Sequence, residues 1–149
     1  MNPVKNFSEF VRDGIVKKQY ADLSRAKFLV KESEKSYVFL KAIMKNIGID
    51  DDNSNSVIKL SYDTIMGLIR AKMLSQGYNA SGQGAHEAEV AYLREIGFSE
   101  NDIQFADQLR YFRNGIMYYG KILDMEYATK VLEFLNKIYP KLRQLLKGD

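Results

Sequence analysis

The segment from residue 109 to residue 120 combines side chains that could bind a phosphate group or a base. Its candidate binding residues are Arg110, Arg113, Asn114, Tyr118 and Tyr119. A guanidinium beside an amide offers planar hydrogen-bond donors to phosphate, and a tyrosine ring can stack on a base. Asn114 and Gly115 are weak helix formers inside an expected helix, and local rule-breaking of this kind is typical of a site.

The same residues also have a structural interpretation. An arginine beside a buried helix face often only pairs with a carboxylate, and tyrosines at helical spacing often belong to a core or a dimer interface. On this helix, five residues at three- and four-residue spacing are expected to face the core: Phe105, Leu109, Phe112, Ile116 and Tyr119.

The elements that must position these side chains are helices, because apolar residues recur at three- and four-residue spacing almost throughout the chain. The expected helices cover about residues 3–12, 22–46, 57–75, 85–96 and 100–119, with a last helix capped by Asp124. Short loops predict an all-α, antiparallel up-and-down bundle of four main helices plus one or two short helices.

We expect a single domain over residues 1–149. Residues 1–21 would form a short N-terminal helix and a connector, and residues 22–147 would form the bundle core. The glycine-rich stretch 76–84 is interpreted as a turn, since it lacks the Lys-Ser/Thr of a phosphate-binding loop and follows a helix. His86 opens the next helix, where a lone histidine is expected to be structural.

The composition limits the chemistry. The chain has no cysteine and one histidine, which excludes disulfides, thiolate metal sites and multi-histidine sites, so we expect no metal and no cofactor. No signal-peptide pattern and no apolar run of about 20 residues occur, which predicts a cytoplasmic protein without membrane contact. The net charge of +3 permits an RNA partner without requiring one.

Four segments in this order resemble the HEPN domain, the higher eukaryotes and prokaryotes nucleotide-binding domain. They are Ser24–Val30, Tyr62–Tyr78, Gly84–Ala88 and, above all, Leu109–Asn114. The resemblance runs from about Ser24 to Leu146. It implies a helical bundle that forms a homodimer, with the arginine-bearing helix near the dimer axis. Many members are metal-independent ribonucleases, often toxins paired with a minimal nucleotidyltransferase antitoxin.

The chain departs from the family at the residue that carries protons. The family signature is an arginine, a polar residue and, after a gap of four to six residues from the arginine, a histidine. Arg113 and Asn114 match, but the three positions that the spacing permits hold Tyr118, Tyr119 and Gly120. A tyrosine, with an ordinary pKa of about 10, is a poor general base at neutral pH.

The sequence therefore favours a dimeric HEPN-like binding or interaction module without efficient ribonuclease activity. It would act with a nucleotidyltransferase-like partner, or bind RNA or a nucleotide through Arg113 and Asn114. One alternative is an active metal-independent ribonuclease of the toxin–antitoxin type, with Arg113, Asn114 and Tyr118 as catalytic residues. The other is a purely structural bundle in which Arg113 only braces the dimer.

Overall fold

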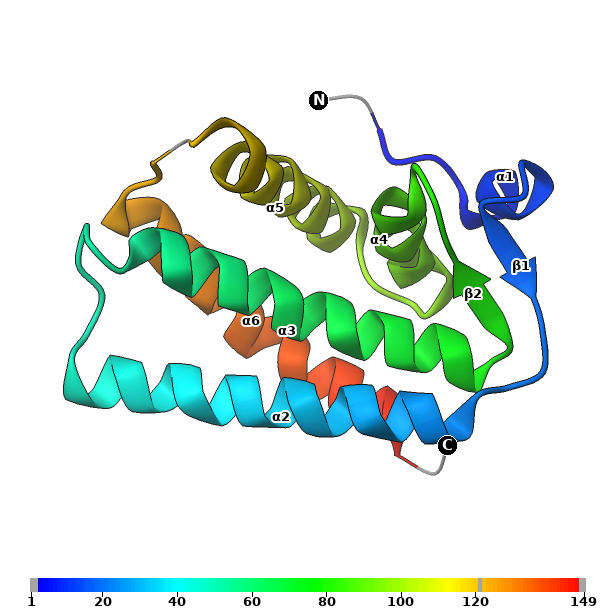
Figure 1. Ribbon diagram of the computed structural model, residues 1–149, viewed down its shortest axis with the longest axis horizontal. Coiled ribbons are helices and arrows are strands. Elements are labelled where there is room, and N and C mark those ends of the chain that lie inside the picture. The colour runs from blue at the N-terminus through cyan, green and yellow to red at the C-terminus, as the bar shows by residue number, and fades with distance from the viewer. Residues whose placement is uncertain (1–2, 121, 148–149) are drawn as a thin grey trace.

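The computed structural model describes residues 3–120 and 122–147, within which six helices pack into a bundle and two short strands pair at one end (Figure 1). The elements are α1 (Phe7–Arg12), β1 (Val16–Lys18), α2 (Leu23–Asn46), α3 (Ser54–Ser75), β2 (Tyr78–Ala80), α4 (Ala85–Glu95), α5 (Glu100–Tyr119) and α6 (Met125–Leu146). The four long helices run alternately in opposite directions (Figure 1). The predicted all-α bundle is confirmed.

Capping side chains set the start of three long helices. Asp22, Ser99 and Asp124 each accept a hydrogen bond from the backbone N–H three residues further on, at 3.1, 3.2 and 2.9 Å. Each such bond satisfies one of the amide groups that the first helical turn leaves without a partner. The predicted caps Ser99 and Asp124 are therefore confirmed, and α5 has the predicted bounds.

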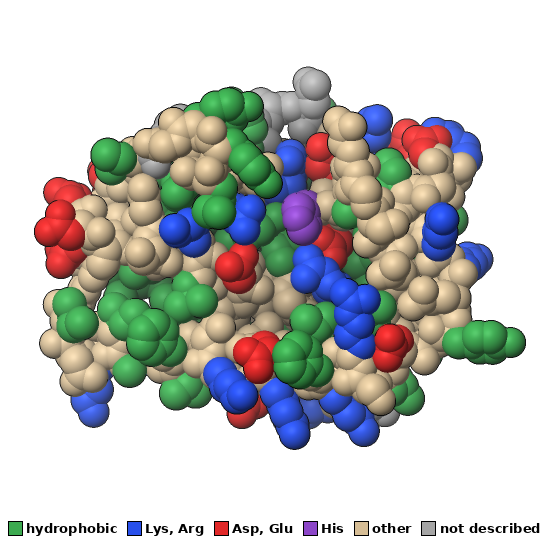
Figure 2. Space-filling model, viewed as in Figure 1, with side chains coloured by type: hydrophobic (Ala, Val, Ile, Leu, Met, Phe, Trp, Pro, Cys, Tyr) green, Lys and Arg blue, Asp and Glu red, His purple; other side chains and the backbone are tan. Residues whose placement is uncertain are grey.

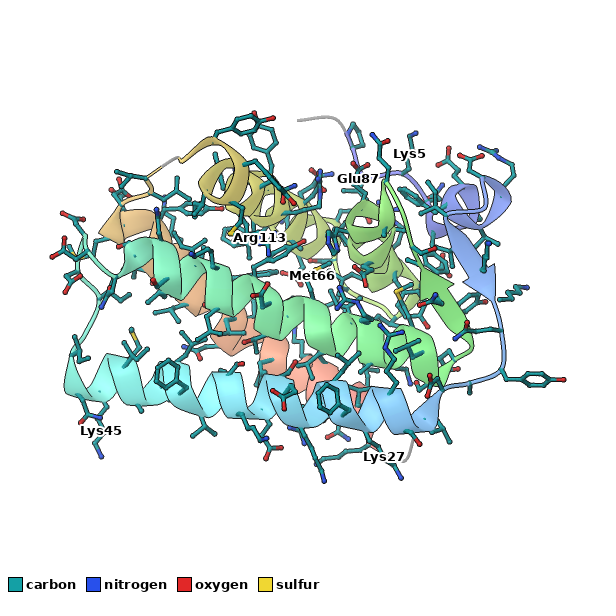
Figure 3. The ribbon with its side chains drawn as sticks, in the orientation of Figure 1. Lys5, Lys27, Lys45, Met66, Glu87 and Arg113 are labelled. Carbon is teal, nitrogen blue, oxygen red and sulfur yellow. The ribbon has the colours of Figure 1, made fainter. Side chains whose placement is uncertain are left out.

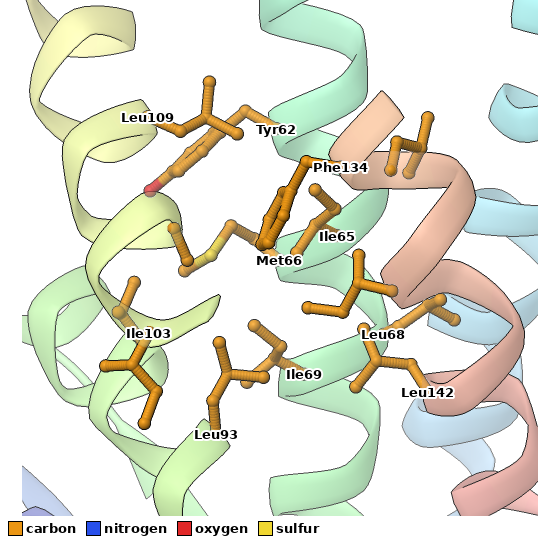
Figure 4. Packing of buried hydrophobic residues seen from close by; sticks show 14 of the residues in the cluster. Tyr62, Ile65, Met66, Leu68, Ile69, Leu93, Ile103, Leu109, Phe134 and Leu142 are labelled. Carbon is orange, nitrogen blue, oxygen red and sulfur yellow. The ribbon is translucent and has the colours of Figure 1, made fainter. Parts of the chain in front are cut away.

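Helix α3 is the centre of the bundle and contacts α2, α4, α5 and α6. Most of its residues are buried, as expected of a core helix, whereas Ser56 and Asp63 are exposed. Figure 4 shows its residues packing between α4 and α5 on one side and α6 on the other, in the cluster that includes Ile65, Leu68, Ile69, Leu93, Ile103 and Leu142. This packing holds α3 in place among its neighbouring helices.

Two predictions near the N-terminus are wrong. The first helix begins at Phe7 rather than near Pro3, because the backbone N–H of Asn6 donates to the Glu9 carboxylate at 3.0 Å and so ends the extended segment there. The glycine-rich stretch is not only a turn, since β2 lies inside it and pairs antiparallel with β1. Three-residue strands are too short to show an alternating pattern in the sequence.

The N-terminal segment packs with the bundle. Phe7, Phe10 and Val16 are buried in the same apolar cluster as α3, and the Phe7 ring lies edge-on to Tyr92 of α4. In the described residues, no helix combines the length and the apolar content needed to cross a membrane.

Gly67 of α3 faces Ser33 of α2 where the two helices pack together. A Cβ atom at residue 67 would collide with the buried Ser33 hydroxyl, although the Ser33 Cβ and the Leu29 carbonyl oxygen would remain at ordinary contact distances of 3.8 and 3.9 Å. A larger residue at position 67 would therefore force the Ser33 hydroxyl out of the space that it occupies.

We predict that Gly67→Ala destabilises the protein by about 1–3 kcal/mol through overpacking. The double variant Gly67→Ala/Ser33→Ala should recover most of this loss, because the colliding hydroxyl is gone and alanine favours the helix. Urea unfolding of both single variants and the double variant measures the coupling. A double variant less stable than Gly67→Ala alone would contradict this account.

Candidate functional site

Where α3, α4 and α5 meet, charged side chains take the place of the apolar core. This polar cluster consists of Tyr62, Asp63, Arg70, His86, Glu87, Glu89, Asp107, Arg110 and Arg113. Figure 2 shows basic, acidic and histidine side chains gathered near the middle of the viewed face, and Figure 3 labels Arg113 between α5 and α3.

The base of the polar cluster is the buried carboxylate of Glu89. Arg70 donates to it twice, from Nε to Oε2 at 2.6 Å and from Nη2 to Oε1 at 3.1 Å, and His86 Nδ1 lies 2.8 Å from the same Oε1. Burial alone would raise the pKa of Glu89, but the hydrogen bonds from His86 and Arg70 outweigh burial and hold this pKa below its ordinary value. Glu89 is thus a buried charge with its partners in place.

Arg110 is held by two carboxylates. Its Nε donates to Asp107 at 2.8 Å, and its Nη1 lies 3.8 Å from Glu87. These acidic side chains offset its positive charge. The predicted binding residue Arg110 is therefore poorly placed to attract an anionic ligand.

Arg113 is bound much more loosely than its neighbours. Its guanidinium lies over the Tyr62 ring, 5.4 Å from the ring centre, and its Nη2 is 3.7 Å from the half-exposed Asp63 carboxylate. Its side chain is 20% exposed, yet its Nε is buried and donates no hydrogen bond within the described part of the chain. A buried donor without an acceptor costs free energy, which an oxygen atom of a ligand or of water would recover.

Tyr62 supplies a second unsatisfied group beside Arg113. Its ring is buried, and its hydroxyl has no hydrogen-bond partner among residues 3–120 and 122–147. Burial, aided by the negative charge of Glu89, raises the pKa of Tyr62 far above its ordinary value, against the opposing effect of three arginines led by Arg113. The phenol is therefore neutral at physiological pH and can donate a hydrogen bond.

The predicted tyrosines lie outside the polar cluster. Tyr118 is 73% exposed and Tyr119 is 86% exposed. Tyr118 follows Arg113 by five residues, which places it about 140° around the helix from the arginine. The prediction that Tyr119 faces the core is wrong, because α5 extends past the last residue that packs on the core, Ile116. The side chain of Asn114 is half-buried. It lies about 100° around the helix from Arg113, the residue before it.

The structure thus brings together Arg110, Arg113 and His86 from the predicted residues, and adds residues that sequence reasoning missed: Tyr62, Asp63, Arg70, Glu87, Glu89 and Asp107. Helical spacing could have predicted part of the polar cluster. Tyr62 and Arg70 are two turns apart, and His86 and Glu89 are one turn apart, so the members of each pair lie on the same face of their helix. Spacing identifies one face of one helix, and it does not tell which faces meet.

We predict that Glu89→Gln destabilises the protein by about 2–4 kcal/mol at neutral pH, because Arg70 loses a buried charged partner. Since the pKa of Glu89 is lowered in the folded state, its stabilising effect is present above the unfolded pKa of about 4.3 and is lost as the pH falls through the folded value. Unfolding of both proteins at pH 7 and pH 3 should show that the difference in their free energies of unfolding is smaller in acid.

A difference that stays constant between pH 7 and pH 3 would disprove the charged pairing. As a control, Glu100→Gln at an exposed ion pair should change the free energy of unfolding much less at pH 7.

No group of three histidine, aspartate or glutamate side chains suited to a metal ion occurs in the described ranges. Comparison with known proteins finds no matching family model, no similar curated protein and no similar solved structure. The function is therefore inferred from the geometry of the polar cluster and from the resemblance carried by the sequence.

Proposed function

We propose that this chain is a HEPN-type helical module that binds the phosphate of RNA or of a nucleotide through Arg113 and has little or no ribonuclease activity. One observation carries this proposal. Of the three arginines in the polar cluster, Arg70 and Arg110 each donate a short hydrogen bond to a carboxylate, whereas Arg113, within residues 3–120 and 122–147, has a 3.7 Å ion pair, a contact with the Tyr62 ring and a buried Nε without an acceptor.

A phosphate oxygen suits this arrangement. Guanidinium groups bind phosphate with two parallel hydrogen bonds, and partial burial strengthens such contacts because the local dielectric is low. The neutral Tyr62 hydroxyl is buried, so it could donate to the same ligand only if the side chains that cover it moved. The exposed Asp63 is a weak competitor, since solvent-exposed ion pairs contribute little.

Binding fits the polar cluster better than cleavage with a tyrosine does. Efficient acid–base catalysis needs a group that exchanges protons near neutral pH. Tyr62 stays protonated because burial raises its pKa, and Tyr118 is on a different face of α5 from Arg113. Neither tyrosine is suited to act as the base.

The proposal includes a protein partner, as the resemblance implies: a second copy of the chain, a nucleotidyltransferase-like protein, or both. Exposed apolar side chains on the second half of α5 and just after it support a protein contact there. They are Tyr111, Met117, Tyr118, Tyr119 and Ile122. Tyr118 and Tyr119 would then serve the interface rather than the core of one chain.

We predict that Arg113→Ala weakens binding of a labelled single-stranded RNA 20-mer, or of labelled ATP, by about tenfold or more, because a charged hydrogen-bonding contact is lost. The slope of log affinity against log salt should fall by about one for the RNA. Fluorescence anisotropy at several salt concentrations measures both quantities.

Arg12→Ala is the matched control, since Arg12 is an exposed arginine on α1 that lies outside the polar cluster. Equal losses in the two variants, or unchanged binding in Arg113→Ala, would refute the proposed site. Thermal unfolding of each variant separates lost binding from lost structure.

A ribonuclease remains the second candidate because of where His86 lies. Its ring packs edge-on to Tyr62 at 6.5 Å between centres, and Arg113 lies over the same tyrosine. The single histidine of the chain is therefore in the same cluster as Arg113, with half of its side chain exposed. Imidazole is the side chain best suited to proton transfer near neutral pH.

We predict that the purified protein does not cleave a tRNA or messenger RNA pool. The ribonuclease candidate instead requires cleavage that falls by about two to four orders of magnitude in His86→Asn and also disappears in Arg113→Ala. Asparagine keeps a hydrogen-bond donor for Glu89, so folding should survive. Gel analysis of RNA fragments decides between the two, and cleavage that persists in both variants indicates a contaminating nuclease.

A further inference from the structure

A groove runs between α2 and α6 and contains two hollows, of about 650 and 350 Å³. The floor of the larger hollow is apolar and includes Leu23, Ala26, Val30 and Leu146. The smaller hollow is lined by Leu40, Met44, Leu132 and Leu135 among others. Both hollows lie on the same pair of helices, so they are parts of one surface.

The two hollows are separated by contacts that join α2 to α6. The rings of Tyr37 and Tyr139 stack with their centres 3.8 Å apart, Tyr37 donates to Asn136 at 2.9 Å, and Arg143 donates to Glu34 at 2.7 Å. These contacts hold the helices together near the middle of the groove. The groove is therefore shaped by fixed contacts and does not depend on a bound partner to form.

The groove has the dimensions of a helix-binding surface. The lining residues of α2 extend from Leu23 to Lys45, which at 1.5 Å per residue is about 33 Å. Two neighbouring helices offer a hollow into which the side chains of a third helix can insert. A partner helix of about 22 residues would cover both hollows.

The rim of the groove is basic. Its lysines are Lys27, Lys31 and Lys147 at the larger hollow and Lys41 and Lys45 at the smaller one. The only acidic residue that lines either hollow in the described ranges is Glu34, which pairs with Arg143. Figure 3 shows Lys27 and Lys45 toward opposite ends of α2, both extending from its outer side.

We propose that this groove docks an amphipathic helix of a partner protein, with an apolar stripe flanked by aspartate or glutamate. The apolar floor does not suit the sugar–phosphate backbone of RNA, and a concave surface does not suit a flat membrane. A symmetric contact with a second copy would bring lysines against lysines. The groove shares no residue with the polar cluster, so this proposal does not depend on ligand binding by Arg113.

The test uses two synthetic 22-residue peptides with the same leucine stripe, one flanked by glutamates and one by lysines, and measures binding by fluorescence anisotropy. The glutamate peptide should bind at least about tenfold more tightly than the lysine peptide. Phe28→Ser and Lys31→Glu, which alter lining residues, should each weaken its binding about fivefold or more.

Matched controls come from the same helix. Phe39→Ser replaces a phenylalanine that is 58% exposed, against 61% for Phe28, and Lys35→Glu replaces an exposed lysine; neither residue lines a hollow. Both controls should bind the glutamate peptide like the original protein.

Three results of the peptide experiment would overturn the proposal: no binding of the glutamate peptide up to about 1 mM, equal binding of the two peptides, or equal losses in the controls. A fourth would show that Phe28 serves another contact. It is either binding to phosphatidylserine vesicles that depends on Phe28, or a change in the sedimentation of the free protein in Phe28→Ser.

Discussion

The burial of the Glu89 carboxylate is the constraint on which the arrangement of α3, α4 and α5 depends. A charge in the interior is tolerated only with close partners, and Glu89 takes one from α3, Arg70, and one from its own helix, His86. This requirement fixes how α4 lies against α3. It also turns a junction that could have been apolar into a polar cluster, against which α5 packs with its own two arginines.

The same constraint explains why Arg113, among the three arginines of the polar cluster, is the one available to an anionic ligand. Within the polar cluster, carboxylates within hydrogen-bonding distance offset the charge of Arg70 and Arg110. Among the carboxylates of the described residues, Arg113 pairs with Asp63, which is half-exposed and therefore well solvated without it. A ligand anion that replaces Asp63 would leave that carboxylate in water at small cost, whereas displacing Glu89 from Arg70 would leave a buried charge unpaired.

Sequence reasoning succeeds here where local chemistry decides the structure. Ser99 and Asp124 mark helix starts because a capping side chain acts within three residues, and apolar spacing gives the long helices. It fails where distant segments meet. The pairing of β1 with β2 and the meeting of Glu89 with Arg70 depend on contacts across 19 to 64 residues, which no local pattern records. Tyr119 shows a related failure, since an apolar stripe can continue beyond the point where the bundle ends.

Helix geometry also limits what a histidine at position 118, the first of the three permitted positions, could have done within one chain. Successive residues of α5 are separated by about 100°, so a side chain at position 118 lies about 140° from Arg113 whatever its chemical type. Such a residue can act together with Arg113 only if a ligand or a second protein surface bridges the two faces of the helix. Within a single chain, the neighbours of Arg113 are Tyr62 and Asp63, a neutral phenol and a solvated carboxylate. These two groups can hold a phosphate or yield to one, but neither is suited to accept a proton from a ribose hydroxyl and later return it. The imidazole of the same cluster, His86, has its Nδ1 2.8 Å from the buried Glu89, and the contacts of Arg113 itself are with Tyr62 and Asp63, so this geometry favours binding.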